Sequence, residues 1–170
     1  MIPKQVIFLV IFLSLSYSLS SQTADCKCCS ENHSAFDFWV GSWEVTNKDG
    51  SIAGKNTIAK VEGDCVLREN WTSATPGYTG TSLNFYNLET GQWEQLWIDN
   101  SGSHLKLRGN KFGNQMILSS DEFEHTDGKL YVNRITWTAN TNGTVRQLWE
   151  VLNKGKVVNV LFDGLYSPIK

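Results

Sequence analysis

The strongest constraint on the fold is a two-residue alternation of apolar and polar side chains, interrupted again and again by short turn sequences. Clusters such as Asn-Lys-Asp-Gly (47–50) and Asn-Thr-Asn-Gly (140–143) separate the alternating segments. Clusters of this kind supply the positive φ angles that tight hairpins need. The expected strands span residues 39–46, 56–63, 65–73, 80–87, 92–99, 104–110, 114–120, 130–139, 144–152 and 157–166.

Ten short strands joined by hairpins predict an antiparallel meander, and no segment of helical periodicity reaches three turns. A meander of this length is expected to close on itself, because closure removes the exposed sheet edges. The sequence therefore predicts an all-β, up-and-down antiparallel barrel of about eight to ten strands. A barrel of that size can enclose one small ligand.

The N-terminus has the pattern of a secretory signal peptide. Lys4 is followed by about ten apolar residues and then by small residues, and this apolar run is shorter than the roughly 20 residues of a membrane-spanning helix. We expect a signal peptide at 1–21, a cysteine-containing segment at 22–38 and the barrel at 39–170. The mature protein is expected to be secreted or periplasmic, without a membrane span.

The charge balance argues against nucleic acid as a partner. The chain has 15 basic and 17 acidic residues, and loss of Lys4 with the signal peptide leaves a net charge of −3. A nucleic-acid-binding surface is normally basic and clustered. The expected partner is a small molecule or an oligosaccharide.

The four cysteines form an even set in an exported chain, which favours disulfides. Cys26, Cys28 and Cys29 precede the barrel and Cys65 lies within it. The alternative is a zinc site that includes His33, but the spacing matches no familiar zinc motif. We expect disulfides that tie the N-terminal segment to Cys65, with the pairing open.

Aromatic residues crowd the start of the expected barrel in the motif F-D-F-W-x-G-x-W, residues 36–43. Gly41 allows the first strand to bend, and Trp43 can fill the narrow end of a barrel. The motif resembles the plug that closes one end of lipocalin-like barrels, and resembles the start of a family of small exported bacterial calycins. Similar proteins accompany polysaccharide breakdown, so the resemblance implies this fold and, as an expectation, a carbohydrate-related function.

The sequence contains no G-x-S-x-G, H-E-x-x-H, phosphate-loop or dinucleotide-binding signature. We therefore expect neither an organic cofactor nor a catalytic metal.

A stripe of tryptophans marks the candidate site. Trp93, Gln95 and Trp97 share one face of their strand, because alternate side chains point the same way. We expect them to line a cavity with Trp71 or Trp137 opposite. Indoles beside amides suit flat ligands such as sugars, although the simpler interpretation is that each indole fills the core.

Arg68, Arg134 and Arg146 also fall within strands. If one of them points inward, its charge requires an anion such as a ligand carboxylate. The simpler interpretation places all three in solvent, and Arg68 and Arg134 have the opposite parity to Trp71 and Trp137.

Tyr86 and His104 are the candidates for proton transfer, as a strand tyrosine and a histidine at the barrel rim. Further acid–base candidates are His33, Tyr78, Tyr131, Glu69 and Asp99.

The function expected from these residues is β-elimination on anionic, uronic-acid oligosaccharides by an exported carbon–oxygen lyase or dehydratase. An arginine would neutralise the substrate carboxylate while a tyrosine or histidine removes the neighbouring proton. The alternative is a non-catalytic, lipocalin-like carrier of a small apolar or amphipathic ligand. A filled, purely structural barrel is the third possibility.

Overall fold

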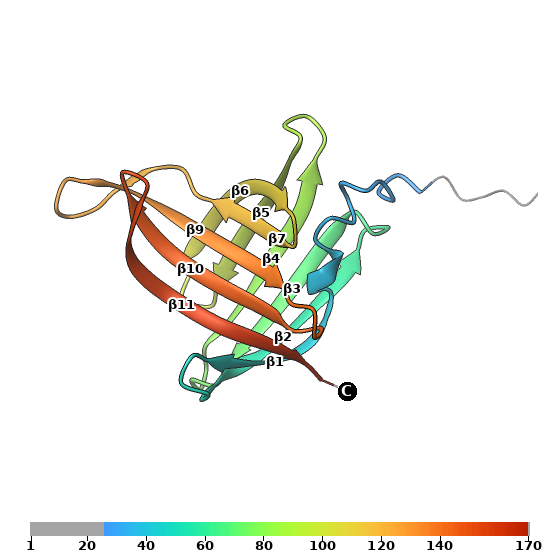
Figure 1. Ribbon diagram of the computed structural model, residues 1–170, viewed down its shortest axis with the longest axis horizontal. Helices are drawn as coiled ribbons and strands as arrows, with labels where there is room; N and C mark the ends of the chain where they lie inside the picture. The colour runs from blue at the N-terminus through green and yellow to red at the C-terminus, as the bar shows by residue number, and fades with distance from the viewer. Residues whose placement is uncertain (1–25, 170) are drawn as a thin grey trace, which may run out of the picture.

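The protein forms an antiparallel β-barrel, as the alternation predicted. The computed structural model describes residues 26–169 (Figure 1). Ten strands form a closed ring in which β1 to β7 follow chain order, β9 pairs with β7, and β11 pairs with β1. The strands are β1 (Gly41–Asn47), β2 (Ile52–Val61), β3 (Val66–Ser73), β4 (Thr79–Asn87), β5 (Gln92–Asp99), β6 (His104–Phe112), β7 (Gln115–Ser119), β8 (Phe123–Glu124), β9 (Leu130–Ala139), β10 (Val145–Asn153) and β11 (Lys156–Pro168).

The alternation in the sequence becomes the inner and outer faces of the barrel. On β1, Trp43 and Val45 are buried while Ser42 and Glu44 are exposed. Tight turns join the strands, and Gly50 in the β1–β2 turn has a φ of 85°. The left-handed conformation at such a position favours glycine, which explains the Asp-Gly signal.

Two features of the strands go beyond the prediction. β8 is a two-residue strand that pairs with the outer part of β9 and lies outside the ring. β11 is longer than predicted, and it pairs on both sides: Tyr166 is opposite Val145 of β10 and Val45 of β1. This double pairing closes the barrel.

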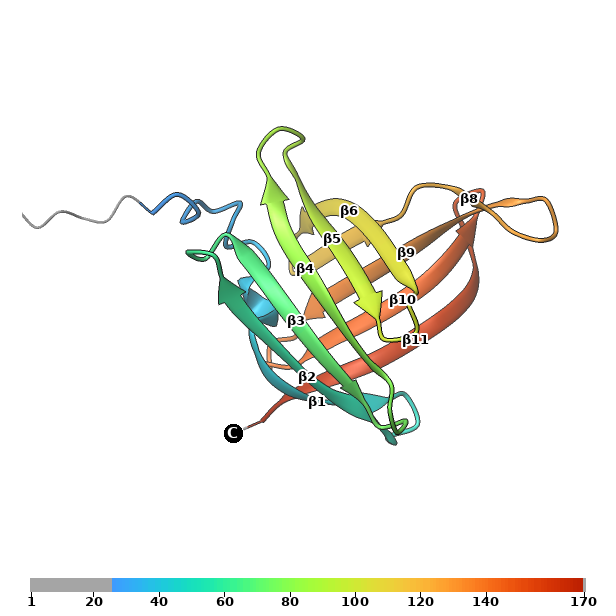
Figure 2. The same ribbon diagram turned by 180° about the vertical axis from the view of Figure 1, so that it is seen from behind.

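The N-terminal segment covers one end of the barrel (Figures 1 and 2). Its short 3₁₀ helix η1 (Asp37–Trp39) carries Phe36 and Trp39 into the interior, where both are fully buried and stack with ring centroids 5.0 Å apart. Trp43 is 5% exposed and donates its indole N–H to the Trp39 carbonyl at 2.9 Å. The predicted burial of Trp43 near a closed end is confirmed.

Disulfides hold this segment in place. Cys28 is bonded to Cys65, in the β2–β3 turn, and Cys26 is bonded to Cys29. The expected disulfides are confirmed, the pairing is resolved, and no thiolate remains for the zinc alternative.

The predicted signal peptide, 1–21, lies outside the described residues. Within residues 26–169, no helix has the length and apolar character needed to cross a membrane.

Candidate ligand cavity

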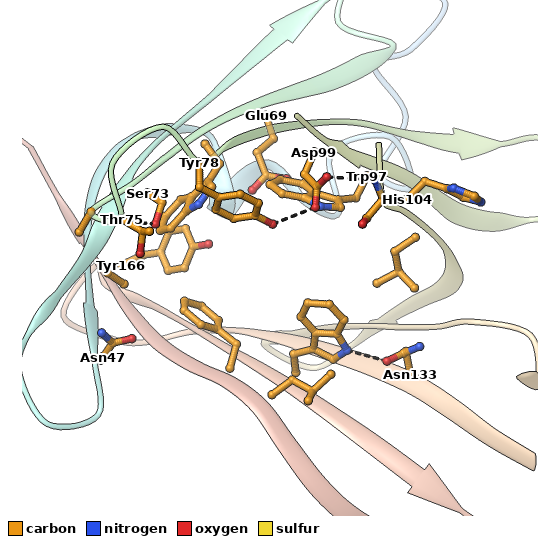
Figure 3. A pocket seen from close by; sticks show the side chains of 18 of the residues that line it. Asn47, Glu69, Ser73, Thr75, Tyr78, Trp97, Asp99, His104, Asn133 and Tyr166 are labelled. Atoms are coloured by element: carbon orange, nitrogen blue, oxygen red, sulfur yellow. Dashed lines mark hydrogen bonds between the residues drawn. The ribbon is translucent and has the colours of Figure 1, made fainter. Parts of the chain in front are cut away.

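The half of the barrel away from the N-terminal segment contains a cavity of about 570 Å³ (Figure 3). Side chains from β1, β2, β3, β5, β6, β9, β10 and β11 line it, together with the loop between β3 and β4. Its volume falls in the range of small-molecule sites, roughly 300–1,000 Å³. The barrel is thus filled by side chains at one end and hollow at the other.

The cavity stays open partly because its large rings lie over glycines. A Cβ on Gly80 would come within 2.2 Å of the Trp97 ring, and a Cβ on Gly54 within 2.7 Å of the Trp71 ring. Glycine lets a neighbouring ring approach the sheet closely. The rings therefore form thin walls instead of filling the space between them.

The facing wall comes from the C-terminal strands. Phe162 on β11 meets Trp71 edge-on, with centroids 6.5 Å apart. Trp149 on β10 donates its indole N–H to the Asn133 side-chain oxygen at 2.8 Å, which fixes the indole at the cavity wall (Figure 3). Aromatic groups thus bound the cavity on two sides.

Glu69 lies at the inner side of the cavity and is only 4% exposed. Its Oε1 accepts a hydrogen bond from the Asn56 amide at 2.6 Å, and its Oε2 accepts one from the Ser82 hydroxyl at 2.5 Å. Burial raises the pKa of the Glu69 carboxyl to about 7, and these two hydrogen bonds oppose the rise. The group therefore changes its charge near neutral pH.

Neutral groups surround this carboxyl. The Ser82 hydroxyl also accepts from the Asn84 amide at 2.9 Å, and the Gln95 amide donates to the Asn84 side-chain oxygen at 2.7 Å. Gln95 was predicted to line the cavity, but it lies behind the cavity wall and is linked to Glu69 through Asn84 and Ser82.

On the other side of Glu69, the Asn56 amide lies 3.4 Å from the Tyr166 hydroxyl, which itself donates to Gln147. Burial, and then the charge of Glu69, raise the pKa of Tyr166 well above its usual value. Tyr166 therefore stays a neutral hydroxyl.

The mouth of the cavity carries a second acidic group. The Tyr78 hydroxyl donates to Asp99 at 3.1 Å (Figure 3), and the Ser101 hydroxyl donates to the same carboxylate at 2.6 Å. The hydrogen bond from Ser101 is the main cause that lowers the pKa of Asp99, so this carboxylate is ionised. His104 is exposed at the mouth.

The structure divides the candidate tryptophans between the two ends of the barrel. Trp71 and Trp97 line the cavity. Trp93 lies at the closed end, where its indole donates to the Asn32 carbonyl at 3.0 Å, and Trp137 packs there against Trp39 with centroids 5.3 Å apart. Their strands also point inward, but the N-terminal segment fills that end of the barrel.

The two proton-transfer candidates do not meet at one ligand, which corrects the prediction. Tyr86 lies near the closed end, edge-on to His33 at 5.4 Å between ring centroids, and it lines a different hollow from His104. Both residues are on the expected strands, but Tyr86 lies near the closed end while His104 is exposed at the mouth of the cavity.

The three arginines lie outside the cavity, so the expectation that one of them reaches it is wrong. Arg68 is exposed. Arg134 pairs with Glu150 at 2.9 Å, and Arg146 pairs with Asp163 at 2.7 Å. Side chains alternate between the two faces of a strand. Trp71, Trp137 and Gln147 face inward, and the arginine on each of these strands lies an odd number of residues away, so it faces outward.

Three residues of the cavity were not predicted to line it: Glu69, which was named only as a further acid–base candidate, Trp149 and Phe162. Glu69 is two residues from Trp71 on β3, so the rule that placed Trp71 inward placed Glu69 beside it. Trp149 shares the inward parity of Gln147. Phe162 follows a register shift between β10 and β11, so simple alternation could not place it.

No family model matches the chain, and no curated protein matches its sequence.

Proposed function

We propose that this protein binds and carries one small amphipathic ligand inside the barrel, as the carrier alternative expected. The observation that carries the proposal is the cavity of about 570 Å³ whose aromatic walls lead to the buried carboxyl of Glu69. Apolar pockets with a few convergent polar groups are typical of small-ligand sites. The disulfides support a role outside the cytoplasm.

The walls and the inner end set different requirements for the ligand. Trp71, Trp149 and Phe162 offer ring faces and edges to an apolar body. Glu69 and its amide neighbours offer polar groups at one inner position only. A ligand with a flat apolar body and a single polar end satisfies both.

Elimination on uronic acids has less support from the cavity. That reaction requires a cation beside the substrate carboxylate, and no lysine or arginine of residues 26–169 lines the cavity. Glu69, once ionised, and Asp99 would also repel an anionic sugar. The carrier function is therefore the one we put forward.

The carrier function can be tested with N-phenyl-1-naphthylamine, an uncharged fluorescent dye. We expect saturable enhancement of its emission with one site per chain. Trp149→Ala should weaken dye binding about 10-fold or more, because it removes part of the wall. Phe112→Ala is the matched control: this ring is 64% exposed and lies away from the cavity.

Absence of saturable binding, or equal loss in the two variants, would contradict the carrier function. Formation of unsaturated products from uronic-acid oligosaccharides would instead restore the lyase hypothesis.

A further inference from the structure

The charges around the cavity are of one sign. Of the groups that line it, Glu69 and Asp99 are acidic, while every lysine and arginine in the described part of the chain lies elsewhere. Buried carboxyls are usually paired with a cation or a metal. Glu69 is instead held by the neutral groups of Asn56 and Ser82.

Hydrogen-bond donors at the inner end are already used. The Asn56 amide donates to Glu69, the Ser82 hydroxyl donates to Glu69, and the Tyr166 hydroxyl donates to Gln147. The capacity that remains is for accepting, because each carboxylate oxygen of Glu69 can accept a further bond. Behind Glu69, outside the cavity lining, the buried Asn56 side-chain oxygen has no partner. The partial negative charge of this orphaned oxygen adds to that of Glu69.

The aromatic walls also present partial negative charge to the cavity. The faces of indole rings are negative and attract cations, tryptophan more strongly than the other aromatic residues. Trp71, Trp97 and Trp149 all line the cavity. Carboxyl, orphaned carbonyl and indoles together make an interior that favours positive charge.

We propose that the ligand is an organic cation, a primary amine on a flat apolar body, with its ammonium group at Glu69 and its body between the tryptophans. This inference rests on the proposed carrier function and specifies the class of ligand. An ammonium supplies the donors and the charge that the inner end lacks. A carboxylate ligand supplies neither, and a hydroxyl supplies a donor without the charge.

Binding of such a cation is linked to protonation of Glu69. The other titratable groups that line the cavity are Tyr78 in the β3–β4 loop, Asp99 on β5, His104 on β6 and Tyr166 on β11. Both tyrosines have raised pKa values and stay neutral, and Asp99 has a lowered pKa and stays ionised. Between pH 5.5 and 8 the Glu69 carboxyl, whose pKa is raised to about 7 by burial, changes its charge.

The test uses three ligands with the same phenyl body: 2-phenylethylamine, 2-phenylethanol and 3-phenylpropionate. Calorimetric titration of the full folded protein at pH 8 should give the amine at least 10-fold higher affinity than the alcohol, and the acid the lowest affinity. From pH 8 to pH 5.5 the affinity for the amine should fall 10-fold or more, because Glu69 becomes neutral. The affinity for the alcohol should stay within about 3-fold.

Two variants identify the group responsible. Glu69→Gln keeps the shape of the side chain and can still accept from the Asn56 amide, while its NH2 group would face Ser82 as a donor. It should remove both the preference for the amine and the pH dependence. His104→Gln should leave both in place.

The outcomes separate the two proposals. If the alcohol or the acid binds as tightly as the amine, or if Glu69→Gln binds the amine like the wild type, the cation inference is overturned while the carrier function stands. If none of the three ligands nor the naphthylamine dye binds, the carrier function itself fails.

Discussion

The indole of Trp97 lies over Gly80 on the neighbouring strand β4, so closely that a Cβ at Gly80 would come within 2.2 Å of the ring. The φ angle of Gly80 lies outside the left-handed region, so its backbone accepts alanine. Space, and not conformation, is what requires glycine there. The close approach of these two residues helps to keep the cavity open.

Gly80→Ala should therefore shrink the cavity. The added methyl group pushes the Trp97 ring inward, and the affinity for N-phenyl-1-naphthylamine should fall about 10-fold. Overpacking should cost about 1–3 kcal/mol of the free energy of unfolding. Leu83→Ala on the outer face of β4, where the side chain is 47% exposed, is the control. Unchanged dye affinity in Gly80→Ala would show that the ring has room elsewhere.

Glu69 should make the protein less stable as the pH rises. Its pKa is raised from 4.5 to about 7 by burial, so its contribution to stability is full below about pH 4.5 and is lost as the pH rises through 7. Between pH 5 and pH 8 the loss is about 2 kcal/mol. Glu69→Gln removes the titrating group, so its free energy of unfolding should not show this loss. The stability of the variant relative to the wild type should therefore be higher at pH 8 than at pH 5 by about the same amount. Urea unfolding of both proteins at the two pH values measures the difference. Parallel pH dependence in the two proteins would mean that Glu69 is not the group responsible.

Loss of the Cys28–Cys65 disulfide should weaken the closed end. The bond joins residues 37 apart in the sequence, and restricting the unfolded chain over a loop of that length contributes about 4 kcal/mol. The double change Cys28→Ser, Cys65→Ser should lower the free energy of unfolding by roughly that amount. Cys26→Ser, Cys29→Ser opens a much shorter loop and should cost about half as much. Equal losses in the two double variants would contradict the loop-length argument.

The ion pairs of Arg134 and Arg146 should contribute to the stability of the protein and not to its affinity for the ligand. Arg146→Ala breaks an exposed pair with Asp163 and should cost at most about 1 kcal/mol of stability. Arg134→Ala should cost more, because its partner Glu150 is only 9% exposed. Dye affinity should stay within about 2-fold of wild type in both. A large loss of affinity in either variant would show that the arginine reaches the ligand.

The candidate site could be predicted only in part, and the tryptophans show why. Trp71, Trp93, Trp97 and Trp137 all face inward, as the alternation of side chains along their strands indicated, because the side-chain period of a strand is two. It could not say how far along the barrel each one lies relative to the N-terminal segment. That segment fills the end that holds Trp93 and Trp137 and leaves the end with Trp71 and Trp97 hollow.

The sequence by itself determined the strands, their turns, the closed barrel and the burial of Trp43, because these follow from local alternation, from turn chemistry and from one aromatic motif. The tertiary structure alone decided the disulfide pairing, the hollow half and the absence of a lysine or arginine of residues 26–169 from the cavity that Glu69 lines. These depend on which residues meet across the barrel: Asn56, Ser82 and Tyr166 come from three different strands to surround Glu69. No local pattern contains such contacts, since they form only when the ring closes and β11 pairs with β1.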